Sequence, residues 1–239
     1  MNLNLDISNK MSSQEGVVKF KQHFTEKLPP EYSSIRELNL WRRILFSLKL
    51  IGQSPDKYDG FAYGNMSQRI APYKYPRNKR RFVITGTQTS GIENLTANHF
   101  ATVLEYYPER NLVVSEGPIE ASSEAMTHGA IYDIDDSIRF VFHVHSPLIW
   151  SNLERLSIPT TLEKIEYGTP EMAYEVRRLF MDTDVSKRHI FSMAGHKDGI
   201  ISFGETSDEA GLILLNYFSK SLYRAIENHA SQECWQLHS

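Results

Sequence analysis

The sequence IRFVFHVHSP, residues 138–147, has the apolar character of a buried strand but carries two histidines, His143 and His145. Side chains alternate between the two faces of a strand, so residues two apart point the same way, with Cβ atoms about 7 Å apart. Two imidazoles at that separation can reach one metal ion, because zinc–nitrogen bonds are about 2.0–2.1 Å long. The pair alone also fits hydrogen-bonded structural histidines or a solvated sheet edge.

A catalytic zinc ion usually takes three protein ligands and keeps one open position. His196 is the best third candidate, because it follows an apolar strand and lies between Gly195 and Gly199, in a stretch that gives the backbone freedom. Functional sites concentrate in such strand-end loops. The remaining histidines fall in terminal segments, in predicted helices or at the start of a strand: His23, His99, His128, His189, His229 and His238.

The segment SSEAMTH, residues 122–128, adds an acidic group and a predicted helix start. Ser122 and Ser123 offer hydroxyl and N–H groups at a helix N-terminus, which binds phosphate or carboxylate well. Glu124 can act there as a general base or as a further metal ligand. Alternatively, Ser122 merely caps the helix and Glu124 favours its dipole. The polar, flexible segments GN (64–65) and TSG (89–91) can also hold an anion.

Strands and helices alternate along the chain, which predicts one α/β domain around a mixed sheet. We expect strands at 81–85, 111–115, 138–146, 189–196 and 199–204. We expect helices from a Ser34–Glu37 capping box to Gly52, from Thr96 to Tyr106, at 122–133, 169–180 and 206–229, and a short one that starts at Pro147. Residues 1–30 read as an aperiodic tail or an arm over the domain or a neighbouring subunit, and residues 31–239 as the domain.

The chain has 239 residues, which suits one α/β domain, and 41% hydrophobic and 23% charged residues, which suit a full globular core. Its net charge of −3 gives no indication of a nucleic-acid or membrane partner. The single cysteine, Cys234, cannot form an internal disulfide, so we expect a cytoplasmic protein. We recognise neither a signal peptide nor the roughly 18 apolar residues of a membrane span.

Six segments, in their order and spacing, resemble the class II aldolase/adducin family. They are GNMS (64–67), ITGTQTSG (84–91), SSEAMTHGAIY (122–132), VFHVHSP (141–147), YGTPEMA (167–173) and GHKDGIISFGET (195–206). The resemblance covers roughly residues 35–225. It implies a three-layer α/β/α fold with a central mixed, mainly antiparallel sheet, and a homotetramer with active sites at subunit interfaces.

The resemblance also implies a divalent metal, most often zinc, and a phosphorylated sugar as substrate. The family's three metal ligands correspond to His143, His145 and His196, and its general base corresponds to Glu124. Its phosphate-binding residues correspond to Asn65, Ser90, Gly91, Ser122 and Ser123. Three departures concern the phosphate pocket and the third ligand. The 84–91 loop is longer than usual, Ala121 replaces a frequent proline, and Lys197 follows His196 where the family commonly has glycine.

The implied activity is that of a metal-dependent lyase of the aldolase type, acting on a small, phosphorylated keto-sugar or hydroxy-ketone through a metal-stabilised enediolate. A 4-epimerase is an alternative, although those relatives commonly have aspartate at the place of Glu124. A dehydratase of the methylthioribulose-1-phosphate type is another, with Glu163 or Glu166 as the base. A non-catalytic, adducin-like interaction protein is the third; such relatives typically lack the metal histidines. Tyr217 or Tyr223 can supply a proton or simply pack.

Overall fold

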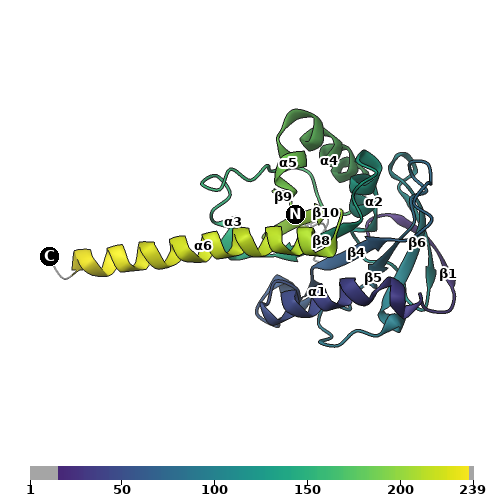
Figure 1. Cartoon of the computed structure of the whole chain (residues 1–239), viewed down its shortest axis with the longest axis horizontal. Coiled ribbons are helices and arrows are strands. Elements are labelled where there is room, and N and C mark those ends of the chain that lie inside the picture. Colours follow the sequence, from purple (N-terminus) through teal and green to yellow (C-terminus); the bar gives the residue numbers. More distant parts are fainter. Residues whose placement is uncertain (1–15, 237–239) are drawn as a thin grey trace, which may run out of the picture.

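The computed structural model describes residues 16–236, which form an eight-stranded sheet between two layers of helices (Figure 1). The strand order is β1-β7-β6-β5-β4-β8-β10-β9, and neighbours pair antiparallel except β1 with β7. The predicted three-layer α/β/α fold with a mixed, mainly antiparallel sheet is confirmed. The strands of this sheet are β1 (Lys21–Glu26), β4 (Asn65–Arg69), β5 (Phe82–Thr85), β6 (Phe100–Tyr107), β7 (Leu112–Gly117), β8 (Phe140–His145), β9 (Ile190–Ser192) and β10 (Gly199–Gly204).

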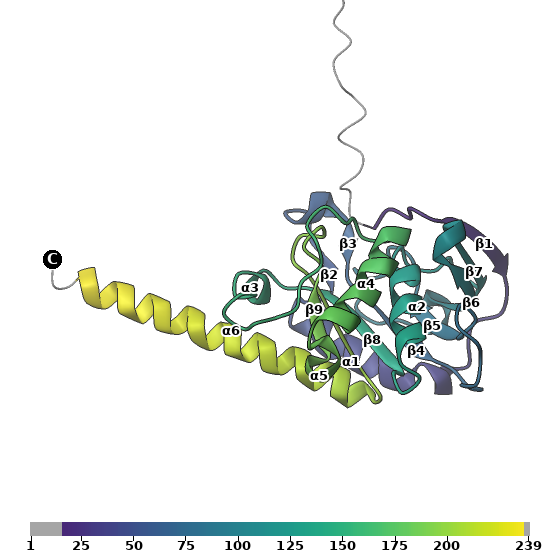
Figure 2. The ribbon, with the colours of Figure 1, turned by 90° about the horizontal axis from the view of Figure 1, so that it is seen from above.

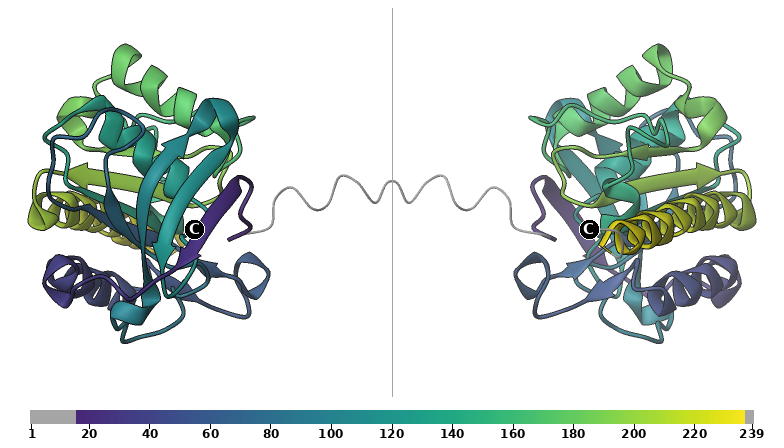
Figure 3. Two further views of the ribbon diagram at one scale, coloured as in Figure 1. Left: turned by 90° about the vertical axis from the view of Figure 1, so that its right-hand side faces the viewer. Right: turned by 90° about the vertical axis from the view of Figure 1, so that its left-hand side faces the viewer.

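The helices cover both faces of the sheet (Figure 3). They are α1 (Arg36–Ser47), α2 (Ala125–Ile134), α3 (Pro147–Trp150), α4 (Pro170–Asp182), α5 (Val185–Arg188) and α6 (Ser207–Gln236). On one face, α2 and α4 pack on Val141 and Ile201. On the other, α1, α3 and α6 pack on Phe142 and Val144. Alternate residues of β8 therefore belong to two separate hydrophobic cores. His143 and His145 lie on the face that α2 and α4 cover.

Short elements complete the fold. A two-stranded ribbon pairs β2 (Gly52–Gln53) with β3 (Ala62–Tyr63). Single 3-10 turns occur at η1 (Tyr32–Ser34), η2 (Tyr58–Gly60), η3 (Ala97–His99) and η4 (Pro108–Arg110). Figure 2 shows that α6 runs out from the rest of the fold. Over residues 16–236, helices long and apolar enough to cross a membrane are absent.

Two predicted helix starts are confirmed by their hydrogen bonds. The Thr169 hydroxyl accepts from the Met172 N–H at 3.3 Å and caps α4. The Thr206 hydroxyl accepts from the Glu209 N–H at 3.0 Å at the start of α6. Each bond satisfies one of the N–H groups that a first helical turn leaves without an internal partner.

The helix predicted from Thr96 to Tyr106 is wrong, because this segment forms η3 and then β6. Phe100, Val103 and Tyr106 are buried at a spacing of three, as in a helix. Phe100 and Val103 lie in different cores, because the strand is buried on both faces. The β-bulge between Val103 and Glu105 then places Tyr106 in the same core as Val103, since an extra residue in a strand shifts the alternation of its faces.

Other predicted boundaries are also corrected. The Ser34 hydroxyl donates to the Glu31 carbonyl at 2.7 Å instead of capping α1, and α1 ends at Ser47, before Gly52. The helix predicted from Ser122 begins at Ala125, with Glu124 as its N-cap residue. The last helix continues past His229 to Gln236. In each case the apolar pattern marked the element but not its end.

The predicted N-terminal arm contains a strand that its sequence did not reveal. Lys21–Glu26 forms β1 and pairs in parallel with β7, so this part of the arm lies on the sheet of its own chain. Its side chains are mostly exposed, and polar residues at a sheet edge give little hydrophobic signal. Residues 1–15 lie outside the described part of the chain, and the domain boundary near residue 30 stays a prediction.

Candidate metal centre and active site

Three buried histidines meet at one end of β8. His143 and His145 come from β8, and His196 from the loop between β9 and β10. A ligand nitrogen from each lies within 4.8 Å of the other two. The ring centroids are 5.0 Å (His143–His145), 5.0 Å (His143–His196) and 4.7 Å (His145–His196) apart. Ligand nitrogens around tetrahedral zinc are about 3.4 Å apart, so small side-chain rotations suffice to place them around an ion.

The sheet itself aligns the first two histidines. His143 pairs with Asn65 of β4 on one side and with Ile201 of β10 on the other. Gly64, at φ +80°, precedes β4, and a Cβ there would lie 3.0 Å from the His143 carbonyl oxygen. Glycine therefore permits both the left-handed backbone and the close approach of this loop to β8.

His196 lies in a tight loop. Its N–H donates to the Met193 carbonyl at 2.7 Å, and its carbonyl accepts from the Gly199 N–H at 2.9 Å. A Cβ at Gly199 would lie 3.4 Å from Nε2 of His143. A larger residue at this position would press its side chain into the histidine cluster. Gly199 therefore leaves room for the histidine side chains, besides giving the backbone freedom.

Burial sets the charge of the site. It lowers the pKa of His145 well below its usual value, and the nearby charges of His196 and His143 act in the same direction. His145 is therefore a neutral imidazole at neutral pH. Neutral imidazole is the form that binds a metal ion, because its lone pair is free of a proton.

Glu124 completes the cluster. Its Oε1 lies 3.0 Å from Nδ1 of His196 and 3.4 Å from Nδ1 of His143, and its side chain is 1% exposed. Burial raises the pKa of this carboxyl, but the charges of His143 and His196, the hydrogen bond with His196 and the charge of His128 together outweigh burial and lower the pKa to about 2. Glu124 is thus ionised at neutral pH and lies where it can act as a base or as a fourth ligand.

The predicted anion-binding residue Asn65 is directed at the metal site. Its side-chain Nδ2 lies 3.2 Å from Nδ1 of His143. Within residues 16–227, its Oδ1 is buried without a hydrogen-bond partner. The amide of Asn65 therefore orients His143 and leaves one buried polar atom for a further partner, whether water or substrate.

Arg42 of α1 holds the loop that carries Ser90 and Gly91. This arginine is buried and donates to the carbonyls of Glu93 at 2.8 Å, Ser90 at 3.0 Å and Ile92. Burial lowers its pKa to about 10, so it keeps its positive charge at neutral pH. The Ser90 hydroxyl donates to the Gly64 carbonyl. Arg42 is a structural partner of this loop that sequence reasoning missed.

Ser122 and Ser123 lie buried in the turn that leads into α2. The Ala125 N–H donates to the Ser122 carbonyl at 3.0 Å. An antiparallel bridge between Gly86 and Ala121 ties this turn to the Ser90 loop. The structure thus brings the predicted phosphate-binding segments next to one another and next to Glu124; phosphate binding by these residues stays a prediction.

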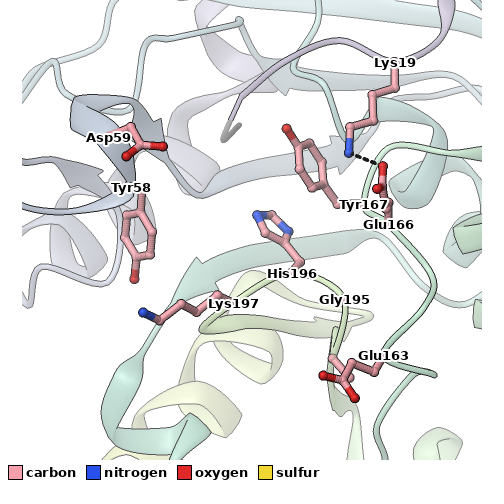
Figure 4. Close-up of a pocket in the computed structure, with 10 residues that line it drawn as sticks. Lys19, Tyr58, Asp59, Glu163, Glu166, Tyr167, Gly195, His196 and Lys197 are labelled. Carbon is pink, nitrogen blue, oxygen red and sulfur yellow. Dashed lines mark hydrogen bonds and ion pairs between the residues drawn. The ribbon is translucent and has the colours of Figure 1, made fainter. Parts of the chain in front are cut away.

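A cavity of about 540 Å³ opens beside His196 (Figure 4). Its lining includes Lys19, Tyr58, Glu163, Glu166, Tyr167 and Lys197. Figure 4 shows Tyr167 next to the His196 ring, with Lys19 and Glu166 beyond it. Lys19 and Glu166 form an ion pair of 2.9 Å. The cavity gives a small molecule access to the histidine cluster, and mixed charges surround that access.

Two tyrosines that sequence reasoning missed contact the histidines. Tyr58 packs against His145 with ring centroids 4.6 Å apart and donates its hydroxyl to Asp198 at 2.8 Å. Tyr167 stacks on His196. Tyr167 belongs to the YGTPEMA segment, which was a signal for it, whereas Tyr58 lies in a segment without periodicity. Tyr223, a candidate proton donor, is 64% exposed on α6.

Residues 55–216 match the family described as Class II Aldolase and Adducin N-terminal domain. None of the curated proteins matches the chain. This match spans more than half of the sequence, so the protein belongs to the class II aldolase/adducin family, as its motifs predicted.

Solved structures share the fold. An L-fuculose-1-phosphate aldolase from Thermus thermophilus has a TM-score of 0.54 at 18% identity, over 87% of this chain and 98% of that chain. A sugar-phosphate aldolase from Thermotoga maritima has a TM-score of 0.59 at 14% identity, over 82% and 95%. The N-terminal class II aldolase domain of a conserved Thermoplasma acidophilum protein has 0.53 at 18%, over 83% and 97%. At such identities the likeness establishes the fold.

The residues of the cluster fit a divalent metal ion. Three imidazoles from a rigid strand and a tight loop offer nitrogen ligands, and the carboxylate of Glu124 adds negative charge beside them. Three histidines with an open fourth position are a common ligand set of catalytic zinc. The identity of the metal is not fixed by this geometry, because the same ligands suit several first-row ions.

Proposed function

We propose that the protein is a metal-dependent lyase of the aldolase type that acts on a small, phosphorylated keto-sugar or hydroxy-ketone. The observation that carries this proposal is the buried contact between Glu124 and the ligand candidates His143 and His196. A carboxylate fixed beside three nitrogen ligands supplies a base next to a Lewis acid, which is what cleavage of the bond between the α and β carbons of a carbonyl compound requires.

His143, His145 and His196 would hold the metal ion, with zinc the expected ion. When bound, a divalent metal polarises the carbonyl of a substrate and lowers the cost of negative charge next to it. Glu124 takes and returns the proton at Oε1 or Oε2. Its burial keeps water away from that exchange, and burial lowers the pKa of His145 and so keeps that imidazole unprotonated for the metal.

The phosphate of the substrate would be held by Ser122, Ser123, Asn65 and the Ser90–Gly91 turn. Asn65 lies beside His143, and the cavity lined by Tyr58 and Tyr167 lies beside His196. A substrate can therefore place its phosphate on one side of the metal and its other fragment on the other.

A dehydratase is the second candidate, and one observation favours it. Glu163 and Glu166 line the cavity beside His196, where a second acid–base group would be needed. Glu166 is 44% exposed and already paired with Lys19, which favours a role in that ion pair. Glu163 is the better acid–base candidate of the two.

A 4-epimerase and a non-catalytic interaction protein have less support. The 4-epimerases of the family commonly have an aspartate where this chain has Glu124. A non-catalytic, adducin-like protein has no need of three histidines buried around one point, since removing polar side chains from water is costly. A homotetramer in the cytoplasm is the assembly and location that accompany the proposed enzyme.

Two measurements test the proposed function. Metal analysis of protein purified without chelator is expected to find one divalent ion per chain. A screen of phosphorylated ketoses is expected to find one that the protein cleaves into an aldehyde and a ketone. A metal-free protein that cleaves none of them would contradict the proposal. Loss of water from a substrate, with its carbon chain intact, would select the dehydratase.

A further inference from the structure

His196 is the ligand candidate that no strand supports. His143 and His145 lie on a central strand with partners on both sides, whereas His196 lies in the loop between β9 and β10. The hydrogen bonds of its backbone fix the loop but not the angle of the ring. The orientation of this imidazole must therefore come from the side chains that pack on it.

Tyr167 provides one flat contact to that ring. The two ring centroids are 4.3 Å apart and the planes meet at 26°, which is a stacked pair. The edge of His145 meets the His196 ring at 80°, with centroids 4.7 Å apart. Tyr167 is itself only 3% exposed. His196 thus has a stacked neighbour in Tyr167 and an edge-on neighbour in His145, and its ring has little freedom to turn.

Close backbone contacts hold Tyr167 in place. A Cβ at Gly168, which has φ +67°, would lie 2.6 Å from the Ser123 carbonyl oxygen. A Cβ at Gly195 would overlap the carbonyl oxygen of Ile165. The loop that carries Tyr167 is therefore pressed against both the turn before Glu124 and the loop of His196, and glycine is required at both contacts.

The segment before β1, with Val17 and Lys19, also contacts Tyr167. The Lys19 ammonium lies 3.9 Å from the centroid of the Tyr167 ring and pairs with Glu166 at 2.9 Å. The Val17 N–H donates to the Tyr167 hydroxyl at 3.2 Å. Cation–π attraction and the ion pair together tie the segment before β1 to the ring that stacks on His196.

We propose that Tyr167, held by Lys19, is a positioning residue that sets the angle of His196 for the metal ion. The inference rests on the metal site of the proposed function. An imidazole that binds a divalent ion carries part of its positive charge, and the electron-rich face of a tyrosine ring attracts such a group. Neighbours that orient a metal-binding histidine commonly change metal affinity about 10–100-fold when they are removed.

The test compares Tyr167→Leu, Tyr167→Met and Tyr167→Phe for their binding of Co²⁺ and Zn²⁺. Leucine and methionine remove the aromatic face, and methionine keeps an adaptable apolar side chain in case leucine fails to fold. We expect both to weaken metal binding about 10–100-fold and to shift the visible absorption of bound Co²⁺, which reports ligand geometry. Phenylalanine keeps the face and is expected to retain the spectrum and affinity of the wild type.

Tyr174→Leu is the matched control. Tyr174 is 47% exposed on α4 and has Arg177 over its ring, so it loses a similar cation–π contact away from the metal site. It is expected to bind metal as the wild type does. Lys19→Met is expected to show a smaller loss than Tyr167→Leu, in the same direction.

Two outcomes distinguish a failure of the proposed metal site from a failure of the proposed role of Tyr167. A wild-type protein that binds neither ion contradicts the proposed metal site itself. A wild-type protein that binds Co²⁺, with folded Tyr167→Leu or Tyr167→Met variants of unchanged affinity and spectrum, overturns only the role of Tyr167.

Discussion

Oε1 of Glu124 lies 3.0 Å from Nδ1 of His196, so the residue at the N-terminal boundary of α2 touches the loop between β9 and β10. The same oxygen lies 3.4 Å from Nδ1 of His143. One carboxylate therefore joins a ligand candidate from the strand to the one from the loop. This shared contact makes the base and the metal site a single unit, and it governs how variants at these positions are expected to behave.

Replacement of Glu124 by glutamine is expected to lower turnover about 10²–10⁴-fold, the usual contribution of general acid–base catalysis. Glutamine keeps the length of the side chain and can still hydrogen-bond, but it cannot accept the proton. Metal content is expected to stay near that of the wild type. Steady-state kinetics on the ketose found by screening, with metal analysis of the same sample, measures both quantities.

Ser123→Ala serves as the comparison for Glu124→Gln. It removes a hydroxyl next to the base but leaves the carboxylate, so it is expected mainly to raise KM for a phosphorylated substrate. If Glu124→Gln retains full turnover, Glu124 is not the base, and Glu163→Gln becomes the variant to measure.

His143→Ala is expected to lose most of the bound metal and to remain folded. The side chain is fully buried, and its removal takes one of three nitrogen ligands away. Metal analysis and circular dichroism of the purified variant test this. Retention of one ion per chain by folded His143→Ala would rule out the three-histidine site.

The stability of the metal-free protein is expected to fall as pH decreases from about 6.5. Burial lowers the pKa of His128 to about 3; the charge of Glu124 opposes that shift and the charge of His143 adds to it. Between about pH 6.5 and that folded-state value, the unfolded chain binds a proton that the folded chain does not. Stability is thus present above this window and is lost as pH falls, by at most about 1.4 kcal/mol per pH unit for this one group.

His128→Asn isolates that contribution. His128 Nδ1 lies 2.6 Å from the Ser67 hydroxyl, and asparagine keeps a polar group for it without a proton that titrates in this range. Urea unfolding at several pH values is expected to give a shallower pH dependence for the variant. His145, whose pKa is lowered in the same direction, maintains part of the slope. Equal slopes for both proteins would show that His128 does not contribute.

Much of the fold could be predicted because its core strands are apolar and its helices carry readable starts. The alternation in β8 predicted a strand with His143 and His145 on one face, and Thr169 predicted the start of α4. The β6 strand was mistaken for a helix because burial on both faces, together with the bulge at Val103–Glu105, gives its buried residues a helical spacing. Only pairing with a neighbouring strand reveals a bulge, and a sequence does not state its pairs.

The sequence was enough to propose the polar residues of the candidate site, but not the residues that hold them in place. Histidines and a glutamate in an apolar context are conspicuous, so His196 and Glu124 could be proposed from their surroundings. Arg42 looks like any surface arginine in the sequence, and the YGTPEMA segment marks Tyr167 without indicating which residue it contacts. Their contacts with the Ser90 loop and with His196 arise from long-range packing, which residue type alone does not specify.

The exposed apolar side of α6 leads to the last prediction, which is that the protein self-associates, with a tetramer as the expected assembly. This helix runs out from the fold (Figure 2), yet Leu212 is 58% exposed, Leu222 46% and Ile226 60%. Apolar side chains grouped along an isolated helix commonly mark a contact with another chain.

Leu222→Lys with Ile226→Lys is expected to shift the sedimenting species toward the monomer, because each lysine places a charge in that contact. Lys220→Glu, a charge change at another exposed position of α6, is the control and should leave the assembly intact. A wild-type protein that sediments as a monomer at micromolar concentration would contradict the prediction, and the apolar side of α6 would then need a different partner.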